Sequence, residues 1–452
     1  MKRMIVNAPA NQASRQFVPV LPYSKSLCNR VLTIQALSWM KDGYIDPAWC
    51  GRIDEGLEVF NPDSDKICDD TRVMLAWLRR AHLLDGDTID VGAAGTAMRF
   101  STALLAMMRS RCVLTGSARM RERPIAVLVD ALRSLGADIE YLEREGFPPL
   151  LINGHRTEGD VNPMHGGMLT LPGNVSSQYI SALLMIGPKL DGGLCLHLEG
   201  EVISRPYIDM TLREINRAGG KASWTGDREI VVEQMPYPVA STPLIEDDWS
   251  AASYWYEVLA LGGCEGSRVV LRNLMEDSTQ GDRRIADIFK HLGVQTHFLQ
   301  DSLHTVELTK SGEISSRLDW DFIETPDLAQ TVVVTCCMLG IPFHFVGLQS
   351  LKIKETDRIV ALQAELSKLG YSVGCSDCEM WWDGVPPVGT PSRCTEQLID
   401  TYKDHRMAMA FAPCALHLGS ITINDPDVVA KSYPGFWREL QKFGFDLESL
   451  DI

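Results

Sequence analysis

The segment Lys354–Arg358 combines side chains that could hold an anion and move a proton. An apolar run at three- and four-residue spacing follows it, which predicts a helix that Thr356 or Asp357 caps. Free backbone N–H groups at a helix start, flanked by a lysine and an arginine, favour anion binding. Because the carboxylate of Glu355 opposes anion binding, its presence here indicates proton transfer. A solvated, charged helix start is the alternative for this segment taken alone.

Cations also mark three other predicted helix starts. Lys25 and Ser26 open an apolar helix, with Arg30 one turn later, a combination suited to phosphate. Residues 119–123 hold three arginines just before a helix, and residues 92–99 form a turn of small residues that lets a ligand approach the backbone. Taken singly, these segments could also be a serine cap, a solvated charge run and tight helix packing.

Polar groups precede the remaining helices. Hydroxyl and amide side chains suited to a polyhydroxylated ring occur at Ser176, Ser177, Gln178, Ser204 and Tyr207. Ionisable groups stand before other apolar runs or in a proline-bounded loop, at Asp327, Asp404, His405, Arg406 and Lys431. Helix starts that converge on one cleft would create an electropositive pocket in an acidic protein.

Composition limits the possible partners. The chain has 452 residues, is 45% hydrophobic and carries a net charge of −16. Such a charge argues against nucleic-acid and anionic-membrane partners, and no apolar run is long enough for a membrane span or a secretory signal. The twelve cysteines lack framework spacing, so Cys375 and Cys378 are expected to be free thiols of a reducing cytosol rather than metal ligands.

The elements that carry these groups recur along the chain. An amphipathic helix, a glycine and a short strand-like run appear together five times, about every 75 residues, with the glycines at Gly136, Gly219, Gly293, Gly370 and Gly444. A further helix is expected at residues 71–82 without the glycine. Six α/β modules are therefore predicted, with a crossing between halves near residue 243. Residues 44–66, rich in Asp and Gly, are expected to be a surface insertion.

Together these segments resemble the 5-enolpyruvylshikimate-3-phosphate synthase family over about residues 19–440. The resemblance is carried by SKSLCNR, GAAGTAMR, RMRERPI, SSQY, SRPYIDMT, PDLAQT, KETDR and DHRMAMAF, in the family's order. It implies an α/β (α+β) fold of two similar domains, each of three βαβαββ units, known as an inside-out α/β barrel. The implied domains are 22–243, and 1–21 with 244–452, with the active site in the interdomain cleft.

The resemblance also implies a reaction. The enolpyruvyl group of phosphoenolpyruvate would move to the 5-hydroxyl of shikimate 3-phosphate through a tetrahedral intermediate, with release of phosphate, in chorismate and aromatic amino acid biosynthesis. The methylene needs an acid and base, the hydroxyl needs a base, and the phosphate and carboxylate need cations. No metal and no organic cofactor is expected. The expected partners are the two small-molecule substrates, with no nucleic acid or membrane, in a cytoplasmic monomer.

Roles follow residue by residue from the same resemblance. Glu355 would serve the methylene, Asp327 would take or orient the hydroxyl proton, Lys25 would assist proton transfer, and His405 would support the site. Phosphoenolpyruvate binding is implied for Lys25, Gly95, Arg123, Gln178, Arg358, Arg406 and Lys431. Shikimate 3-phosphate binding is implied for Lys25, Ser26, Arg30, Ser176, Ser177, Gln178, Ser204, Tyr207, Asp327, Ser350 and Lys354.

The sequence departs from the family pattern without losing a proton-transfer group. The departures are Tyr23 for Gly, Cys28 for Ser, Ala93 for Asn, Phe100 for Pro, Ser350 for Asn, and Trp249 for a small residue. Because Gly95 is retained in the phosphoenolpyruvate pocket, sensitivity to the competitor glyphosate is expected.

Three alternatives remain beside this interpretation. A UDP-N-acetylglucosamine enolpyruvyl transferase would carry a reactive cysteine where this chain has Arg119–Arg123, and Cys112 lies upstream in a strand-like run. A non-catalytic ligand-binding protein on the same fold would be expected to lack Lys25, Asp327 or Glu355. A domain of a multi-enzyme polypeptide is not expected, because little chain lies outside the matching region.

Overall fold

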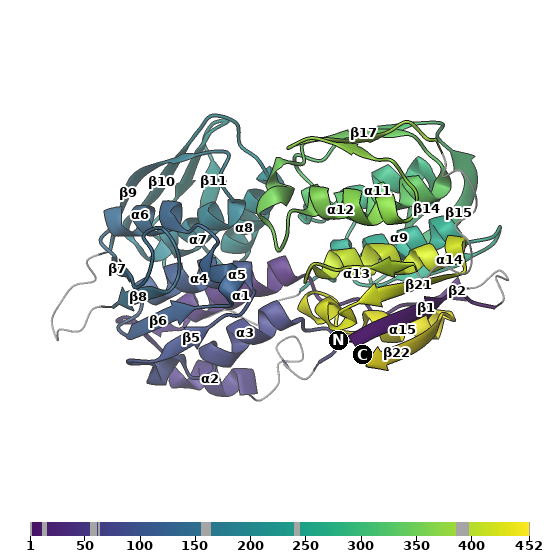
Figure 1. Cartoon of the computed structure of the whole chain (residues 1–452). Helices are drawn as coiled ribbons and strands as arrows, with labels where there is room; N and C mark the ends of the chain where they lie inside the picture. The colour runs from purple at the N-terminus through teal and green to yellow at the C-terminus, as the bar shows by residue number, and fades with distance from the viewer. Residues whose placement is uncertain are drawn as a thin grey trace. The chain divides into compact units, whose positions relative to one another are not determined.

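The chain forms two compact units in the computed structural model, which describes residues 2–10, 16–54, 61, 64–154, 164–238, 245–385 and 397–451. The inserted unit is Tyr23–Ile245, and the terminal unit combines Met1–Pro22 with Glu246–Ile452. The expected crossing near residue 243 lies outside the described residues. Figure 1 labels the elements along the chain.

Five four-stranded sheets share one arrangement among the described residues: one outer strand is parallel to its neighbour and the other two pairs are antiparallel. The inserted unit holds β5 Thr88–Asp90, β6 Arg111–Thr115, β7 Asp138–Tyr141, β8 Leu150–Asn153, β9 His165–Pro172, β10 Asp191–Glu199, β11 Ala222–Trp224 and β12 Glu229–Val232. The terminal unit holds β1 Lys2–Asn7, β2 Gln16–Phe17, β13 Arg268–Leu271, β14 Leu292–Phe298, β15 Val306–Ile314, β16 Leu318–Asp321, β17 Phe343–Val346, β18 Gly374–Cys375, β19 Met380–Trp382, β20 Leu398–Ile399, β21 Ser420–Asn424 and β22 Asp446–Asp451.

Helices alternate with these strands. Those of the inserted unit are α1 Lys25–Ser38, α2 Pro47–Asp54, α3 Asp69–Leu78, α4 Gly95–Ala106, α5 Ala118–Arg121, α6 Ala126–Ser134, α7 Ser177–Ile186 and α8 Arg205–Arg217. Those of the terminal unit are α9 Trp249–Gly262, α10 Ile285–Lys290, α11 Ala329–Leu339, α12 Arg358–Lys368, α13 His405–Phe411, α14 Ala415–Leu418 and α15 Phe436–Phe443. Short 3₁₀ turns include η4 Gly281–Arg284, η5 Pro326–Leu328, η6 Gln349–Ile353 and η8 Pro426–Lys431.

The βαβαββ order is directly visible in three stretches of chain: β5-α4-β6-α6-β7-β8, with α5 between β6 and α6; β9-α7-β10-α8-β11-β12; and β16-α11-β17-α12-β18-β19. All five repeat glycines have positive φ, a backbone conformation that favours glycine. The expected α/β repeat is therefore confirmed for these modules. The sheets are separate and open within the described residues, not one closed barrel.

The module expected at the start of the inserted unit differs from the others. Between residues 23 and 84, the described residues contain α1, α2 and α3 but only a two-stranded pair, β3 Met40–Lys41 with β4 Tyr44–Ile45. The expectation of a surface insertion at 44–66 was wrong for two apolar residues of its described part. Ile45 and Trp49 are 1% and 3% exposed and belong to the hydrophobic core of the unit. Burial of an apolar side chain lowers the free energy of the folded state, even where the surrounding sequence is polar.

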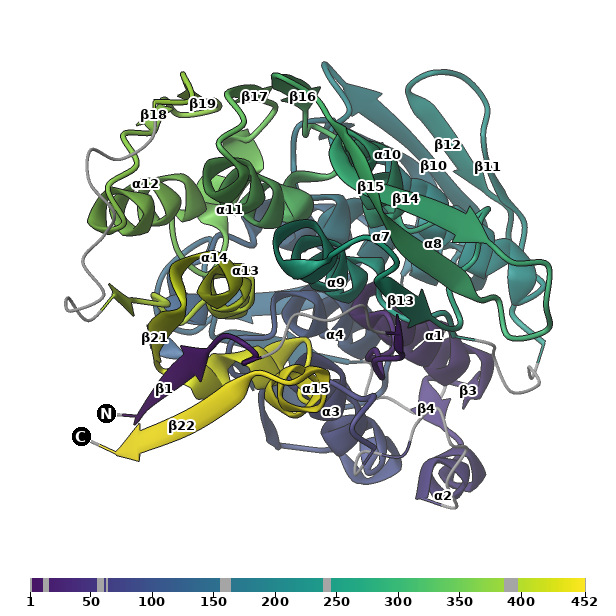
Figure 2. The same ribbon diagram turned by 90° about the vertical axis from the view of Figure 1, so that its right-hand side faces the viewer.

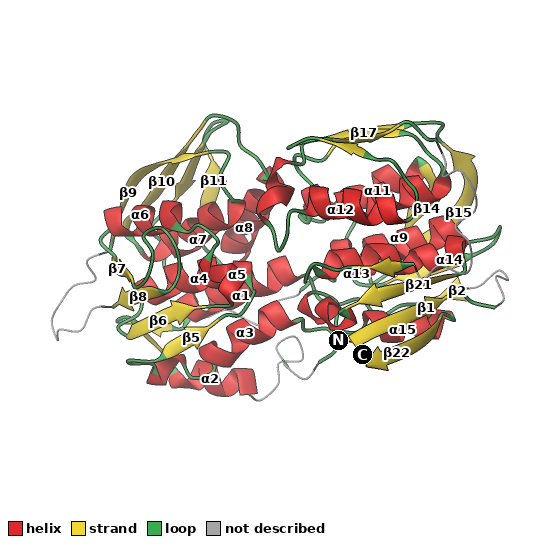
Figure 3. Cartoon of the chain, in the orientation of Figure 1, coloured by secondary structure: helices red, strands yellow, loops and turns green. Residues whose placement is uncertain are grey.

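Within each unit, apolar helices form the core and the sheets lie around them (Figure 3). In the terminal unit, α11 packs against both α9 and α13, and Figure 2 shows these helices surrounded by its three sheets. Every residue of α11 from Ala329 to Met338 is buried, as expected of a helix that is apolar on all sides. The N-terminal strand β1 pairs with β21 and β22, which places both chain ends in this unit.

Candidate active site

Arg358 is the centre of an ion-pair cluster in the terminal unit. Asp357 caps α12 by accepting from the backbone N–H groups of Ile359 and Val360, as predicted, and this places Arg358 at the first helical position. Its side chain is 2% exposed. The guanidinium contacts three carboxylates: Nε to Asp404 Oδ2 at 2.6 Å, Nη1 to Asp327 Oδ1 at 2.8 Å and Nη2 to Glu355 Oε2 at 3.0 Å.

These charges hold the arginine in its ionised form. Burial acts to lower the pKa of Arg358, but the nearby carboxylates of Asp404, Glu355 and Asp327 raise the pKa above its usual value. A buried cation surrounded by carboxylates is stable because each charge offsets the desolvation of the others. Arg358 therefore remains charged across the physiological pH range.

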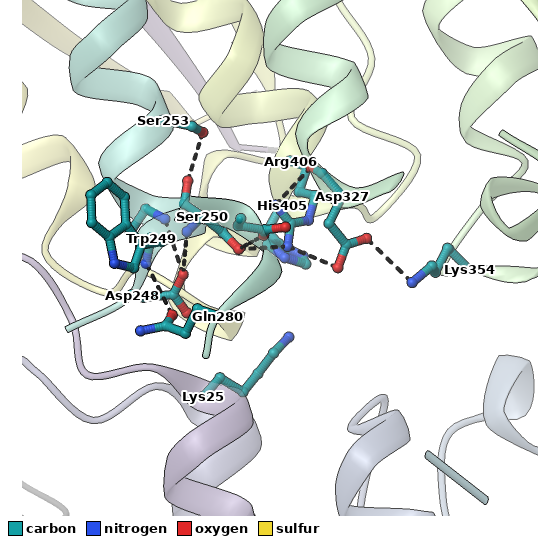
Figure 4. A network of polar contacts seen from close by, with 12 residues as sticks. Lys25, Asp248, Trp249, Ser250, Ser253, Gln280, Asp327, Lys354, His405 and Arg406 are labelled. Carbon is teal, nitrogen blue, oxygen red and sulfur yellow. Dashed lines mark hydrogen bonds and ion pairs between the residues drawn. The ribbon is translucent and has the colours of Figure 1, made fainter. Parts of the chain in front are cut away.

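Asp327 receives two further cations. It lies in η5, just before α11, and its Oδ1 is 3.2 Å from Lys354 Nζ, while its Oδ2 is 3.2 Å from Arg406 Nη2. Arg406 Nη1 also donates to the backbone carbonyl of Asp327 at 3.0 Å. Figure 4 shows Lys354 and Arg406 on either side of this carboxylate. Burial lowers the pKa of Lys354, and the charge of Asp327 opposes that shift.

The remaining terminal-unit residues complete the cluster. Lys431, at the end of η8, forms an ion pair with Glu355 Oε1. Asp404 caps α13 by accepting from the backbone N–H of Arg406 at 2.9 Å. His405 is 1% exposed, and its Nδ1 lies 3.7 Å from Asp404 Oδ1, which is beyond hydrogen-bond distance. The structure thus brings together Asp327, Lys354, Glu355, Arg358, His405, Arg406 and Lys431.

Lys25 and Arg30 lie on α1 of the inserted unit. Lys25 is the first residue of α1, and its Nζ lies 3.3 Å from the buried carboxylate of Asp70 on α3. Arg30 is 2% exposed, and burial lowers its pKa to about 10. Its donors reach neutral acceptors: Thr211 Oγ1 at 2.7 Å, and the carbonyls of Ser26 at 2.8 Å and Tyr207 at 3.1 Å. Arg30 therefore holds the backbone of Ser26 and Tyr207, two residues that are predicted to bind shikimate 3-phosphate.

Gly95 and Arg123 are in close contact. Gly95 opens α4, and a Cβ built on it would lie 2.8 Å from Arg123 Nη1. Such a contact is too short for a real side chain, so only glycine leaves the guanidinium in place. The departure Phe100, on the same helix, is fully buried and lies 5.4 Å from the Arg30 guanidinium.

The polar residues predicted for a sugar-like ring occupy two further helix starts in the inserted unit. Ser176 caps α7 by accepting from the Gln178 N–H at 3.4 Å, and the Gln178 amide donates to Thr96 Oγ1 at 3.1 Å. Ser177 opens α7, and Ser204, in a left-handed conformation, precedes α8, which contains Tyr207. In the terminal unit, Ser350 lies in η6, and its hydroxyl has no hydrogen-bond partner among the described residues.

Sequence reasoning missed several acids of these clusters. Asp70 and Asp282 were not singled out, and Asp404 was noted only as part of the Asp-His-Arg motif. An acidic residue in the first turn of a helix or at its cap, close to a cationic motif, is the signal that could have identified Asp70 and Asp404. Ranges that the structure describes contain no cluster of three or more His, Cys, Asp or Glu suited to a metal, and no helix long and apolar enough to cross a membrane.

Comparison with known proteins gives one consistent result. Residues 55–440 match the family described as EPSP synthase (3-phosphoshikimate 1-carboxyvinyltransferase). A 3-phosphoshikimate 1-carboxyvinyltransferase of Bacteroides fragilis is 47% identical over 450 residues, covering 99% of both chains. One from Vibrio cholerae is 34% identical over 422 residues, covering 92% of this chain and 94% of the relative.

The fold has solved counterparts. An EPSP synthase structure from Acinetobacter baumannii aligns with a TM-score of 0.72, covering 99% of this chain and all of that chain, at 19% identity. A second structure from the same organism gives a TM-score of 0.71 at 18% identity. At these identities the likeness concerns the fold alone, and it agrees with the two-unit α/β architecture described above.

Proposed function

The chain belongs to the EPSP synthase family of 3-phosphoshikimate 1-carboxyvinyltransferases, and we propose that the polar helix starts of its two units carry that family's reaction. The protein is a transferase of the shikimate pathway. It moves the enolpyruvyl group of phosphoenolpyruvate to the 5-hydroxyl of shikimate 3-phosphate and releases phosphate. The observation that carries our assignment of residues is the contact of one buried arginine, Arg358, with three acids, Glu355, Asp327 and Asp404.

Glu355 is our candidate for proton transfer at the methylene carbon. It accepts from Lys431 and from Arg358, so two cations stabilise its ionised form. Phosphoenolpyruvate carries a phosphate and a carboxylate, which would compete for the same two cations. When those cations turn to the substrate, Glu355 loses charge stabilisation and gains proton affinity. Substrate binding itself would thus prepare the acid that protonates the methylene.

Asp327 is our candidate for the 5-hydroxyl. Two arginines and a lysine around it keep it ionised, so it can accept a hydrogen bond or a proton from the sugar hydroxyl. His405, buried beside Asp404, supports the helix start that carries Arg406. Lys25 would assist proton transfer, with Asp70 fixing its ammonium group.

Binding of the two substrates is distributed over the remaining groups. For phosphoenolpyruvate we propose Arg123, Arg358, Arg406 and Lys431, with the Gly95 backbone lining the pocket. For shikimate 3-phosphate we propose the hydroxyls of Ser26, Ser176, Ser177, Ser204 and Ser350, together with Gln178, Tyr207 and Lys354. Arg30 contributes by holding the Ser26 and Tyr207 backbones. We also propose that the two units are the two enolpyruvyl-transferase domains, and that the protein acts as a cytoplasmic monomer without a metal or organic cofactor.

One assay tests the assignment of substrates. Phosphate release from phosphoenolpyruvate is measured with shikimate 3-phosphate and, in parallel, with UDP-N-acetylglucosamine. Release with shikimate 3-phosphate alone is expected. Release with the nucleotide sugar would instead favour a UDP-N-acetylglucosamine enolpyruvyl transferase. The burial of Cys112 argues against that enzyme, because a cysteine that is 1% exposed within β6 is poorly placed to react. Release with neither, from protein that still binds shikimate 3-phosphate, would favour a binding protein.

A further inference from the structure

A carboxylate with no role in the reaction outlined above lies behind the cluster of the terminal unit. Asp282, in the short turn η4, is 3% exposed. Its Oδ2 accepts a hydrogen bond from the hydroxyl of Ser250. Ser250 is the second residue of α9, and its backbone N–H donates to the cap residue Asp248 at 2.7 Å. The position of the serine is therefore fixed by its main chain and its side chain.

The Ser250 hydroxyl links this acid to the site. Arg406 Nη2 donates to Ser250 Oγ at 3.4 Å, and the same nitrogen lies 3.2 Å from Asp327 Oδ2. Figure 4 shows Ser250, Arg406 and Asp327 in this order. A hydroxyl has one proton and two lone pairs, so an ionised Asp282 that takes the proton turns a lone pair toward Arg406. A continuous chain of contacts thus runs from Asp282 through Ser250 and Arg406 to Asp327.

The charges around Asp282 come from several elements. Asp327 of η5 and Asp248 at the start of α9 are negative, and Arg406 of α13 is positive. Burial raises the pKa of Asp282 to about 6, the charges of Asp327 and Asp248 add to the shift, and Arg406 and the Ser250 hydrogen bond oppose it. Interaction between two carboxylates is mutual, so the charge of Asp282 also makes Asp327 harder to ionise.

We propose that Asp282 is a positioning residue for the transfer reaction, which orients the Ser250 hydroxyl toward Arg406 and thereby holds that arginine against Asp327. The proposal rests on the proposed function, because it concerns the residues assigned there to the 5-hydroxyl and to phosphoenolpyruvate. The proposal also predicts a dependence on pH. When Asp282 is protonated, the Ser250 hydroxyl is no longer held in one orientation by the carboxylate, and activity falls.

The first test compares pH profiles. In Asp282→Asn the shape is kept and the charge is removed, so Asp327 ionises at lower pH. We expect the acid limb of kcat/KM for phosphoenolpyruvate to move to lower pH, and the plateau to fall about tenfold, as for one misaligned contact. The matched control is Asp287→Asn on the adjacent helix α10, where the carboxylate is 44% exposed and pairs with Arg283 and Arg284. This control should leave both the limb and the plateau unchanged.

The second test is a double-mutant cycle with the serine. If Asp282 acts through the hydroxyl, then Ser250→Ala and Asp282→Asn together should lower the plateau by about tenfold, not by the product of the two single effects. Ser250→Thr keeps the hydroxyl and should restore a value close to wild type. Because Arg406 is assigned to phosphoenolpyruvate, Ser250→Ala should raise KM for that substrate more than KM for shikimate 3-phosphate.

The outcomes separate the two proposals. An inactive wild-type protein in the phosphate-release assay would overturn the proposed function. An active wild type whose Asp282→Asn acid limb stays in place, or whose double mutant loses the full product of the single effects, would overturn the positioning role alone. If Asp282→Asn does not fold, the KM split of Ser250→Ala and the rescue by Ser250→Thr decide the question, and equal rises in both KM values would refute it.

Discussion

The guanidinium of Arg358 and the carboxylate of Asp404 form a buried two-point ion pair, with Nε 2.6 Å from Oδ2 and Nη2 3.4 Å from Oδ1. The same carboxylate caps α13, so one acid fixes both the arginine of α12 and the helix that carries Arg406. Two helix starts of the site are therefore held in one geometry. Losing Arg358 would take this counter-ion from the buried carboxylate of Asp404, and losing Asp404 would leave Arg358 with only its contacts to Asp327 and Glu355.

The loop before Asp404 is tied to the same helix α12 at a second point. Tyr402 and Lys403 both have positive φ, a conformation that strains residues other than glycine. Glu365, fully buried on α12, accepts from Tyr402 Oη at 2.6 Å and from the Asp400 N–H at 3.0 Å. These bonds offset the strain and present Asp404 to Arg358.

Removing the tyrosine hydroxyl should loosen this loop. We expect Tyr402→Phe to lower the free energy of unfolding by about 1 kcal/mol, the typical contribution of one hydrogen bond, and to lower kcat/KM for phosphoenolpyruvate several-fold. Denaturant unfolding and steady-state kinetics measure the two effects. Tyr44→Phe in β4, where the side chain is exposed, is the control. Unchanged stability and kinetics in Tyr402→Phe would show that the hydrogen bond from Tyr402 to Glu365 does not position the loop.

Glu355 should control turnover more than binding. Glu355→Gln keeps the size of the side chain, but its NH2 group can no longer accept from one of the two cations, Lys431 and Arg358, and the amide cannot deliver a proton. We expect kcat to fall by about 10²–10⁴-fold, with the dissociation constant of shikimate 3-phosphate unchanged. Rapid-quench kinetics and calorimetric titration check this. Glu324→Gln, on the exposed loop before η5, is the control, and a wild-type kcat in Glu355→Gln would remove the glutamate from the mechanism.

A side chain at position 95 should displace Arg123. In Gly95→Ala the new Cβ would lie 2.8 Å from Arg123 Nη1, so the guanidinium must move away from its present position. We expect KM for phosphoenolpyruvate to rise by about tenfold, the equivalent of one weakened charged contact, while KM for shikimate 3-phosphate stays constant. Steady-state kinetics with each substrate varied in turn gives both values. Equal changes in the two would argue against a pocket at Gly95.

Glyphosate should compete with phosphoenolpyruvate in the wild-type protein. Because Gly95 has no side chain, the inhibitor can occupy the space and contact the arginines that we assign to phosphoenolpyruvate. Inhibition is measured at low and high phosphoenolpyruvate, and the apparent inhibition constant should rise with substrate concentration. Full activity in millimolar inhibitor at low phosphoenolpyruvate would contradict this expectation and would point to an altered pocket.

Stability should depend on pH through Glu257. This residue is fully buried on α9, and burial raises its pKa well above the usual range. The folded state therefore holds a proton that the unfolded chain releases, so stability falls as pH rises above the unfolded pKa, by about 1.4 kcal/mol per pH unit until the folded pKa is reached. Glu257→Gln needs no proton, and its melting temperature should exceed that of the wild type at pH 8.

The difference in melting temperature between Glu257→Gln and the wild type shows the direction of this effect. This difference in melting temperature should shrink as pH falls below 4.5, the ordinary pKa of a glutamate, because both side chains then become neutral in the folded and in the unfolded state. Glu313→Gln, at an exposed position of β15, should show no such trend. If the wild-type protein melts at the same temperature as Glu257→Gln across this range, then burial does not raise the pKa of Glu257 in the folded protein.

Local features of the sequence were sufficient for the repeat and for the helix starts. The cap at Asp357 and the glycine ends at Gly136 and Gly370 depend on residues within one or two turns, so periodicity and residue type identify them. The candidate residues of Lys354–Arg358, Asp404–Arg406 and Lys25 could be proposed in the same way, because each group stands directly before an apolar periodic run.

Only the tertiary structure decided which charges meet. Arg358 and Asp404 are 46 residues apart in sequence, and Lys25 finds Asp70 on another helix. Asp282 reaches the cluster only because η4 packs against the start of α9. Such pairs form where burial removes water and each charge must find a counter-ion or a hydrogen bond. The sequence by itself determined the helix starts and their polar groups, and the packing of distant elements determined which of these groups hold one another.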